Sequence, residues 1–159
     1  MTAVCLIIIV IDQLSKYLIS SSMTLGFSFP VIDGIFHITY IQNSGAAFGV
    51  LAEKRWIFIA AGIIIIGLAV YFRKKIMRER PVVRYGTAML VGGAIGNLID
   101  RIMIGRVIDF LDFRVWPIFN IADIGICVGV ALLMYELVAA DFLGGHCDSE
   151  DADNVETAK

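Results

Sequence analysis

Residues 56–72 read WIFIAAGIIIIGLAVYF, an apolar run without a single charged side chain. A helix needs about 20 residues, with a range of roughly 17–25, to cross the hydrocarbon core of a bilayer. Aromatic side chains collect at the two membrane interfaces, and this run begins with Trp56 and has Tyr71 near its end. The stretch predicts a membrane-spanning helix and decides the fold class.

Three further apolar runs have a similar length, at about 3–22, 82–104 and 119–140. A hydrophobic fraction of 58% and a mean hydropathy of +0.82 are too high for a water-soluble globule of 159 residues. The first run carries Asp12 and Lys16 and has no basic segment before it, so we expect a retained helix rather than a cleaved signal peptide. The sequence predicts an all-α membrane protein with four transmembrane helices, forming one domain over residues 1–143.

The orientation follows from the segment between the second and third runs. Residues 73–84 hold six of the thirteen Lys and Arg residues, and short loops this basic stay in the cytoplasm. Both termini are then cytoplasmic, and residues 23–55 and 105–118 lie on the outer side. Six of the fifteen acids lie in the last nineteen residues, so we expect residues 144–159 to form an acidic, disordered cytoplasmic tail.

The first outer segment contains a hairpin pattern. Residues 26–32 and 35–41 are rich in aromatic and β-branched side chains and flank Asp33-Gly34, which is typical of a tight turn. We expect a small extracytoplasmic β-ribbon at about 25–42. Because two strands alone are marginally stable in water, the ribbon should rest on the membrane surface or on the helices.

Charged side chains within the apolar runs are costly, by about 2.5–3.5 kcal/mol near a helix centre, and need a partner or a role. Asp12 and Lys16 are spaced i,i+4 with the acid first, which predicts an ion pair on one helix face. Such a pair either holds helices together or braces a polar cavity.

The third run combines small and polar residues. Gly92 and Gly96 form a GxxxG pattern, which by itself indicates helix packing. Asn97, Asp100 and Arg101 follow on one face, and we expect some of them to serve a site.

Two further pairs of polar residues lie at the outer edge of the predicted membrane region. Asp109 and Asp112 follow the third run, and a carboxylate at a membrane edge is commonly a solvated charge. Asn120 and Asp123 open the last run, where helix capping explains them equally well. All the polar groups nevertheless converge at one depth, which indicates a one-sided site.

Two carboxylates in a poorly solvated pocket do not both ionise easily, so one keeps its proton while the other acts as a base. That is the equipment of aspartic hydrolysis, which needs no metal and no cofactor. A serine triad lacks a well-placed base, because His37 lies in the ribbon and His146 in the tail. A magnesium site built from the acids has no accompanying phosphate loop. No basic stripe indicates nucleic-acid binding.

The chain resembles the bacterial lipoprotein signal peptidases (signal peptidase II). The resemblance rests on five short blocks in family order: Asp12-Gln13-Leu14-Ser15-Lys16, Asn43-Ser44-Gly45-Ala46-Ala47-Phe48, Gly92-Gly93-Ala94-Ile95-Gly96-Asn97-Leu98-Ile99-Asp100-Arg101, Val107-Ile108-Asp109-Phe110 and Phe119-Asn120-Ile121-Ala122-Asp123. It implies an aspartyl endopeptidase of the bacterial inner membrane. Such an enzyme removes signal peptides from prolipoproteins, on the N-terminal side of a diacylglyceryl-modified cysteine, at the outer leaflet.

The resemblance also implies a role for each matching residue. Asp109 and Asp123 would be the catalytic pair, and Asp112, outside it, should tolerate replacement by Asn. Asp12 and Lys16 would brace the first helix. The site would be shaped, and the substrate held, by Asn43, Asn97, Asp100, Arg101 and Asn120. The expected partners are prolipoproteins and membrane lipid, and the expected state is a monomer.

Two interpretations compete with the peptidase. Intramembrane acids with a Lys and an Arg also occur in proton-coupled transporters and channels, although these distribute polar residues through the whole membrane depth. Here the inner halves of the last three runs are nearly free of them, with Glu136 the main exception. A structural scaffold that pairs through the glycine face is the second alternative.

Overall fold

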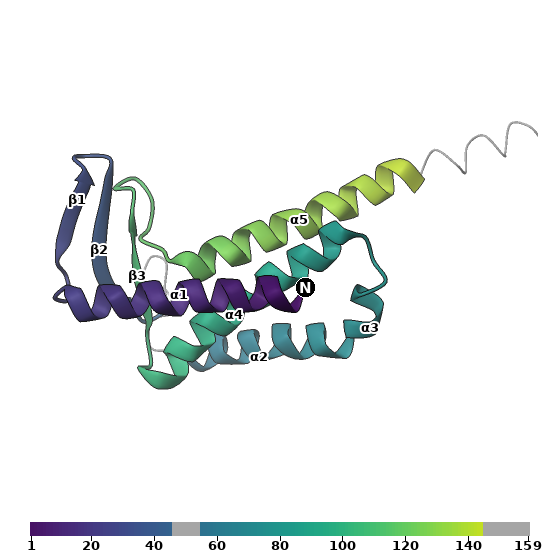
Figure 1. Cartoon of the computed structure of the whole chain (residues 1–159), viewed down its shortest axis with the longest axis horizontal. Coiled ribbons are helices and arrows are strands. Elements are labelled where there is room, and N and C mark those ends of the chain that lie inside the picture. The colour runs from purple at the N-terminus through teal and green to yellow at the C-terminus, as the bar shows by residue number, and fades with distance from the viewer. Residues whose placement is uncertain (46–54, 145–159) are drawn as a thin grey trace, which may run out of the picture.

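The protein folds into a helical bundle with a small sheet at one end. The structure, a computed structural model, describes residues 1–45 and 55–144. The expected acidic tail therefore lies outside the described residues, apart from Gly144, as do Ala46, Ala47 and Phe48 of the second block. The long helices are α1 (Thr2–Ser22), α2 (Arg55–Tyr71), α4 (Pro81–Met103) and α5 (Ile121–Gly144). The short helix α3 (Arg73–Ile76) lies at the end of the bundle opposite the sheet (Figure 1).

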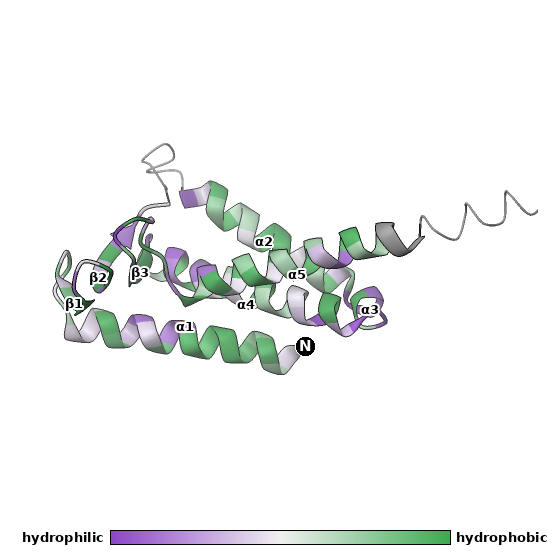
Figure 2. Cartoon of the chain, turned by 90° about the horizontal axis from the view of Figure 1, so that it is seen from above, coloured by the Kyte–Doolittle hydropathy of each residue, from purple (hydrophilic) through white to green (hydrophobic). Residues whose placement is uncertain are grey.

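Three of the helices are long and apolar enough to cross a membrane. These are α1, α4 and residues Ile121–Ala140 of α5. The charge-free run at 56–72 forms α2, the shortest of the four long helices. It has 17 residues, and the chain turns at Phe72 into the basic α3. Figure 2 shows mostly apolar residues along the helices and hydrophilic residues at α3, at the sheet and midway along α1. The fold is thus mostly helical and membrane-like.

The sheet has three strands, in the order β1 (Ser28–Ile32), β2 (Phe36–Asn43) and β3 (Val107–Asp112), and both pairings are antiparallel. The predicted turn is present, because the Ile35 amide donates to the Ile32 carbonyl at 3.0 Å and Gly34 has a φ of 70°. The predicted ribbon is present as β1 and β2, but the sheet also has a third strand that was not predicted. Residues 107–112 form a third strand, whose two acids obscure the strand pattern because partners far away in the sequence bury them.

Helix α4 runs through the middle of the bundle and packs closely on both sides through glycine. A Cβ atom added to Gly92 would lie 3.0 Å from the Cys5 carbonyl of α1, and one on Gly96 would lie 2.5 Å from Asp12 Oδ2. The prediction that these glycines serve helix packing is confirmed. Close packing also brings the Asp12 carboxylate against α4, where it meets the polar residues of that helix.

Gly93 is the glycine whose replacement should cost most stability. A Cβ atom there would overlap the backbone carbonyl of Ala122 in α5, which cannot move without displacing the helix. We expect Gly93→Ala to lower the free energy of unfolding by about 1–3 kcal/mol, the range for overpacking. Gly67→Ala is the matched control, because nothing lies within 4 Å of its added Cβ, and it should be neutral or slightly stabilising. Thermal unfolding in detergent measures both, and equal melting temperatures would contradict the close packing.

Candidate active site

The polar cluster between α1 and α4 is centred on Lys16. Its Nζ lies 2.9 Å from Asp12 Oδ2 and 2.9 Å from Asp100 Oδ2, and it donates to Asn97 Oδ1 at 3.0 Å. The predicted i,i+4 ion pair is confirmed. Lys16 is only 2% exposed, so its charge is compensated by two carboxylates rather than by water. The cluster therefore connects α1 to the polar face of α4.

Gln13 completes this cluster, although the sequence analysis did not single it out. Its Nε2 lies 3.1 Å from the Gly96 carbonyl and 3.0 Å from Asp100 Oδ1. Its position between Asp12 and Lys16 in the first block was the available signal. Asp100 Oδ2 also accepts the Ile108 amide at 3.1 Å, which extends the network from the helices into β3.

Asp12→Ala tests how much the Lys16 cluster contributes to the free energy of unfolding. Asp12→Ala deprives Lys16 of one carboxylate, and the Ala122 amide at the start of α5 loses its acceptor, 2.9 Å away. Because Asp100 still compensates Lys16, we expect a loss of about 1–3 kcal/mol in the free energy of unfolding rather than complete unfolding. Denaturation of the purified variant in detergent measures this loss. Unchanged stability with lost activity would instead place Asp12 in the chemistry.

Asn120 and Asp123 form a reciprocal cap at the start of α5. The Asp123 amide donates to Asn120 Oδ1 at 3.0 Å, and the Asn120 amide donates to Asp123 Oδ2 at 3.2 Å. This is the arrangement of a capping box, with Asp in place of the usual Glu. The capping interpretation is therefore confirmed, and it holds the Asp123 carboxylate in a fixed place at the helix N-terminus.

Asp109 is brought beside Asp123 by the side chain of Asn120. The Asn120 Nδ2 lies 2.6 Å from Asp109 Oδ1, and the Asn43 Nδ2 donates to Asp109 Oδ2 at 2.9 Å. Asp109 is 2% exposed and Asn120 fully buried. One residue thus contacts both acids, one through its side chain and the other through its backbone.

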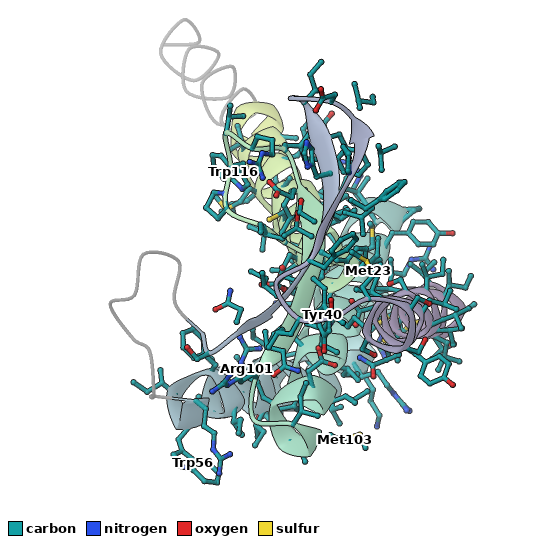
Figure 3. The ribbon with its side chains drawn as sticks, turned by 90° about the vertical axis from the view of Figure 1, so that its left-hand side faces the viewer. Met23, Tyr40, Trp56, Arg101, Met103 and Trp116 are labelled. Atoms are coloured by element: carbon teal, nitrogen blue, oxygen red, sulfur yellow. The ribbon has the colours of Figure 1, made fainter. Side chains whose placement is uncertain are left out.

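Asn97 joins the Lys16 cluster to this pair of acids. Its Nδ2 donates to Asp123 Oδ1 at 2.7 Å, while its Oδ1 accepts from Lys16. Arg101, labelled in Figure 3, donates to the Asn97 carbonyl at 3.2 Å, lies 4.9 Å over the Phe58 ring and is close enough to both acids to interact with their charges. The nine residues singled out from the sequence therefore form one connected region.

The surroundings of Asp109 disfavour its ionised form. Burial raises the pKa of Asp109 to about 6; the negative charge of Asp123 acts in the same direction, and the amides of Asn43 and Asn120 oppose it. At neutral pH and below, Asp109 therefore retains its proton far more readily than an exposed carboxyl group does.

A cavity of about 1230 Å³ gives access to both acids. Asn43, Asp109 and Asp123 line it, together with the loop around Arg114 to Phe119 and the Ile124, Cys127 and Val128 face of α5. A smaller, apolar cavity of about 460 Å³ lies between α2, α3 and α4, and none of these acids lines it. Within residues 1–45 and 55–144, no group of three or more His, Cys, Asp and Glu side chains has a geometry suited to a metal ion.

Asp112 does not belong to this network. Its place on β3, three residues after Asp109, turns its side chain to the other face of the strand. Its interpretation as a solvated charge was wrong, because Asp112 is 4% exposed and accepts from Thr39 Oγ1 at 2.8 Å and from Arg114. Burial by itself would raise the pKa of Asp112, but these hydrogen bonds outweigh it and hold the pKa below its ordinary value.

The chain is similar to a known protein family over most of its length. The family model described as "Signal peptidase (SPase) II" matches residues 4–139, which include every residue of the site. The chain belongs to the signal peptidase II family. It is therefore an aspartic endopeptidase that cleaves prolipoprotein signal peptides, and the transporter and scaffold interpretations are set aside.

Individual relatives are similar over nearly their whole length. A lipoprotein signal peptidase of Halothermothrix orenii is 44% identical over 142 residues, covering 89% of this chain and 97% of that protein. One of Desulfitobacterium hafniense is 47% identical, covering 82% and 87%. A solved structure of a bacterial membrane enzyme, determined by the in meso method at 2.3 Å, superposes with a TM-score of 0.81 at 37% identity and covers 87% of each chain. This signal peptidase II is a bacterial membrane protein.

Proposed function

We propose that Asp109 and Asp123 are the catalytic pair of this peptidase and activate water between them. The observation that carries the proposal is the position of Asn120, whose side-chain amide contacts Asp109 and whose backbone amide contacts Asp123. Two acids fixed to one buried residue, and open to one cavity, have the arrangement that aspartic hydrolysis requires.

The two acids have different surroundings and take different roles. Asp109, with its raised pKa, holds the proton in the resting enzyme. Asp123 lies in the first turn of α5 and accepts a backbone amide there, and a helix N-terminus stabilises negative charge. Asp123 is thus the base, and Asp109 is the hydrogen-bond donor to the scissile carbonyl.

The reaction then proceeds without a covalent intermediate. Asp123 takes a proton from water as the oxygen attacks the carbonyl carbon, and Asp109 gives its proton to the carbonyl oxygen. When the tetrahedral intermediate collapses, Asp123 passes its proton to the leaving nitrogen while the new hydroxyl group returns a proton to Asp109. Both acids then return to their starting protonation states.

The remaining residues orient this pair. Asn43 and Asn120 hold the two oxygens of Asp109, and Asn97 holds Asp123. Arg101 compensates the negative charge of the site and is placed to bind the substrate backbone. The ion pairs of Lys16 with Asp12 and Asp100 brace α1 against α4 beside the site.

The substrate is a prolipoprotein with a diacylglyceryl-modified cysteine after the scissile bond. We place the sheet end at the outer leaflet of the cytoplasmic membrane and the basic α3, at the opposite end, in the cytoplasm (Figure 1). Helix α2 is the fourth span, because the uncharged run 56–72 lies between two cations. These are Arg55, whose guanidinium lies 4.8 Å from the centre of the Trp56 ring, and Arg73. Both acids come from one chain, so one chain holds a complete catalytic pair, and we propose that residues 1–143 act as a single-domain monomer.

The pH dependence of cleavage tests this assignment. The pKa of Asp109 is raised from 3.8 to about 6, so the protonated form needed for catalysis is lost only above that pH. We expect kcat/KM to fall about ten-fold per unit on an alkaline limb that begins near pH 6. The free energy of unfolding should depend on pH in the same direction. Because the folded state binds the proton of Asp109 more tightly than the unfolded state does, the contribution of Asp109 to stability is complete below pH 3.8 and is lost as the pH rises through about 6.

Profiles from pH 4.5 to 8.5 with purified enzyme measure the limb. Asp33→Asn, an exposed acid in the β1–β2 turn, is the control and should leave the limb in place. An alkaline limb absent up to pH 8.5 would contradict the role of Asp109 as the protonated member.

A further inference from the structure

Arg114 has an unusual backbone conformation. With a φ of 64°, it is the one residue other than glycine with a positive φ in the part of the chain that the structure describes. In this left-handed region the Cβ atom is crowded, so Gly and Asn normally occupy it. Such strain persists where neighbouring contacts impose it, and it is frequent at binding sites.

The contact that imposes it is with Asp112. Asp112 Oδ1 accepts the Arg114 backbone amide at 2.8 Å, and Oδ2 accepts Arg114 Nη1 at 3.2 Å. The Asp112 side chain is itself held by hydrogen bonds that run across the sheet. Thr39 Oγ1 lies 2.8 Å from it and 2.7 Å from Ser28 Oγ, which lies 3.1 Å from His37 Nδ1. All three strands therefore hold the carboxylate that positions Arg114.

Aromatic packing anchors the same loop. The Phe113 ring lies 6.0 Å from that of Phe119, nearly parallel to it, and 4.9 Å from that of Phe36. The next two residues, Val115 and Trp116, are 92% and 68% exposed. The loop is thus fixed at its start and projects outward, as the position of Trp116 at the rim of the sheet end also shows (Figure 3).

Arg114 lines the same cavity as Asp109 and Asp123. Its side chain is half exposed, and a guanidinium has five N–H donors, of which Nη1 contacts Asp112. Because the Asp112 carboxylate already balances the charge, the remaining donors suit neutral carbonyl oxygens. The α5 residues that line the cavity after Asp123 are apolar, whereas Arg114 lies in the loop beyond β3.

We propose that Arg114, held by Asp112, forms a binding subsite for the backbone carbonyls of the substrate segment that follows the lipidated cysteine. This inference rests on the proposed function, in which the signal peptide lies along α5 within the membrane and the mature segment leaves toward the outer side. Arg114 is then a substrate-binding residue, and Asp112 is a positioning residue that acts through it.

The test compares two diacylglyceryl-modified peptides that share one signal sequence. One ends in an amide directly after the lipidated cysteine, and the other continues for four uncharged residues. In the wild type we expect the longer peptide to have a KM about ten-fold lower, as hydrogen bonds from a charged donor allow. In Arg114→Gln the two KM values should coincide, and in Asp112→Asn their ratio should fall to about two.

Three further variants separate binding from folding. Arg114→Asn tolerates the left-handed backbone, so it should melt no lower than the wild type and still lose the length effect. Arg114→Lys keeps the charge without the planar donors and should retain only part of the effect. Arg106→Gln removes an exposed charge on the same side of the protein, and it should leave the ratio of the two KM values at the wild-type level.

The outcomes distinguish the subsite from the catalytic pair. A wild type that binds both peptides equally overturns the subsite and leaves the peptidase mechanism intact. A length effect that survives in Arg114→Gln also overturns it, as does a loss in Asp112→Asn confined to kcat and equal for both peptides. Retained turnover in Asp109→Asn would overturn the mechanism and not the subsite.

Discussion

Asp109→Asn is expected to lower kcat by about 10³–10⁴-fold while the protein remains folded. An amide has nearly the shape of the carboxyl group but cannot give a proton to the carbonyl oxygen and take it back. The contacts to Asn43 and Asn120 need rearrangement, because amide N–H groups would then face one another. That rearrangement is local, since the Lys16 cluster and the cap of α5 do not depend on Asp109.

Single-turnover cleavage of a lipidated substrate, with thermal unfolding beside it, checks this expectation. Asp33→Asn makes the same chemical change at an exposed turn and should keep wild-type turnover. Turnover of the Asp109 variant within ten-fold of the wild type would contradict a proton-transfer role.

Asn120→Ala is expected to lower kcat by about 10²-fold. The change removes the amide that holds Asp109 and the oxygen that caps the Asp123 backbone. Loss of such a cap costs about 1 kcal/mol of stability, whereas an error of about 1 Å in the placement of reacting groups can cost 10²-fold in rate. Activity should therefore suffer more than folding.

Asn120→Asp separates positioning from capping. The carboxylate oxygen still caps the Asp123 amide, but a second negative charge now faces Asp109. A like charge disfavours ionisation, so the pKa of Asp109 should rise and the alkaline limb of kcat/KM should move to higher pH. A limb that stays in place would show that Asn120 serves folding alone.

The helices were predictable because membrane spans depend on composition over about 20 residues. The observed bounds of α1, α4 and α5 lie within a few residues of those predicted. The hairpin turn at Asp33-Gly34 was equally local. β3 was not predictable in this way, because its pairing with β2 connects residues about 70 positions apart and Asp109 and Asp112 interrupt its apolar pattern.

The residues of the candidate site could be predicted from the sequence for a different reason. Polar side chains in apolar runs are costly, so Asp12, Lys16 and Asn97 stood out individually, and the five blocks connected them to a family. Apart from the i,i+4 ion pair of Asp12 and Lys16, the contacts among them could not be predicted, because they join residues far apart in the sequence. Asn120 both caps α5 and donates to Asp109. Only the fold shows that helix capping and a role in the site are compatible for this one residue. The burial of Asp112 depends on Thr39, a residue without a distinctive pattern.

The central claim is a metal-independent cleavage by the Asp109–Asp123 pair. Its most direct test is cleavage of a diacylglyceryl-modified prolipoprotein by purified enzyme in detergent with excess EDTA, comparing the wild type with Asp123→Asn. We expect the wild type to release the signal peptide at the same rate with and without chelator, and the folded Asp123→Asn variant to release none. Cleavage by Asp123→Asn, or loss of wild-type cleavage in EDTA that added metal restores, would contradict the account.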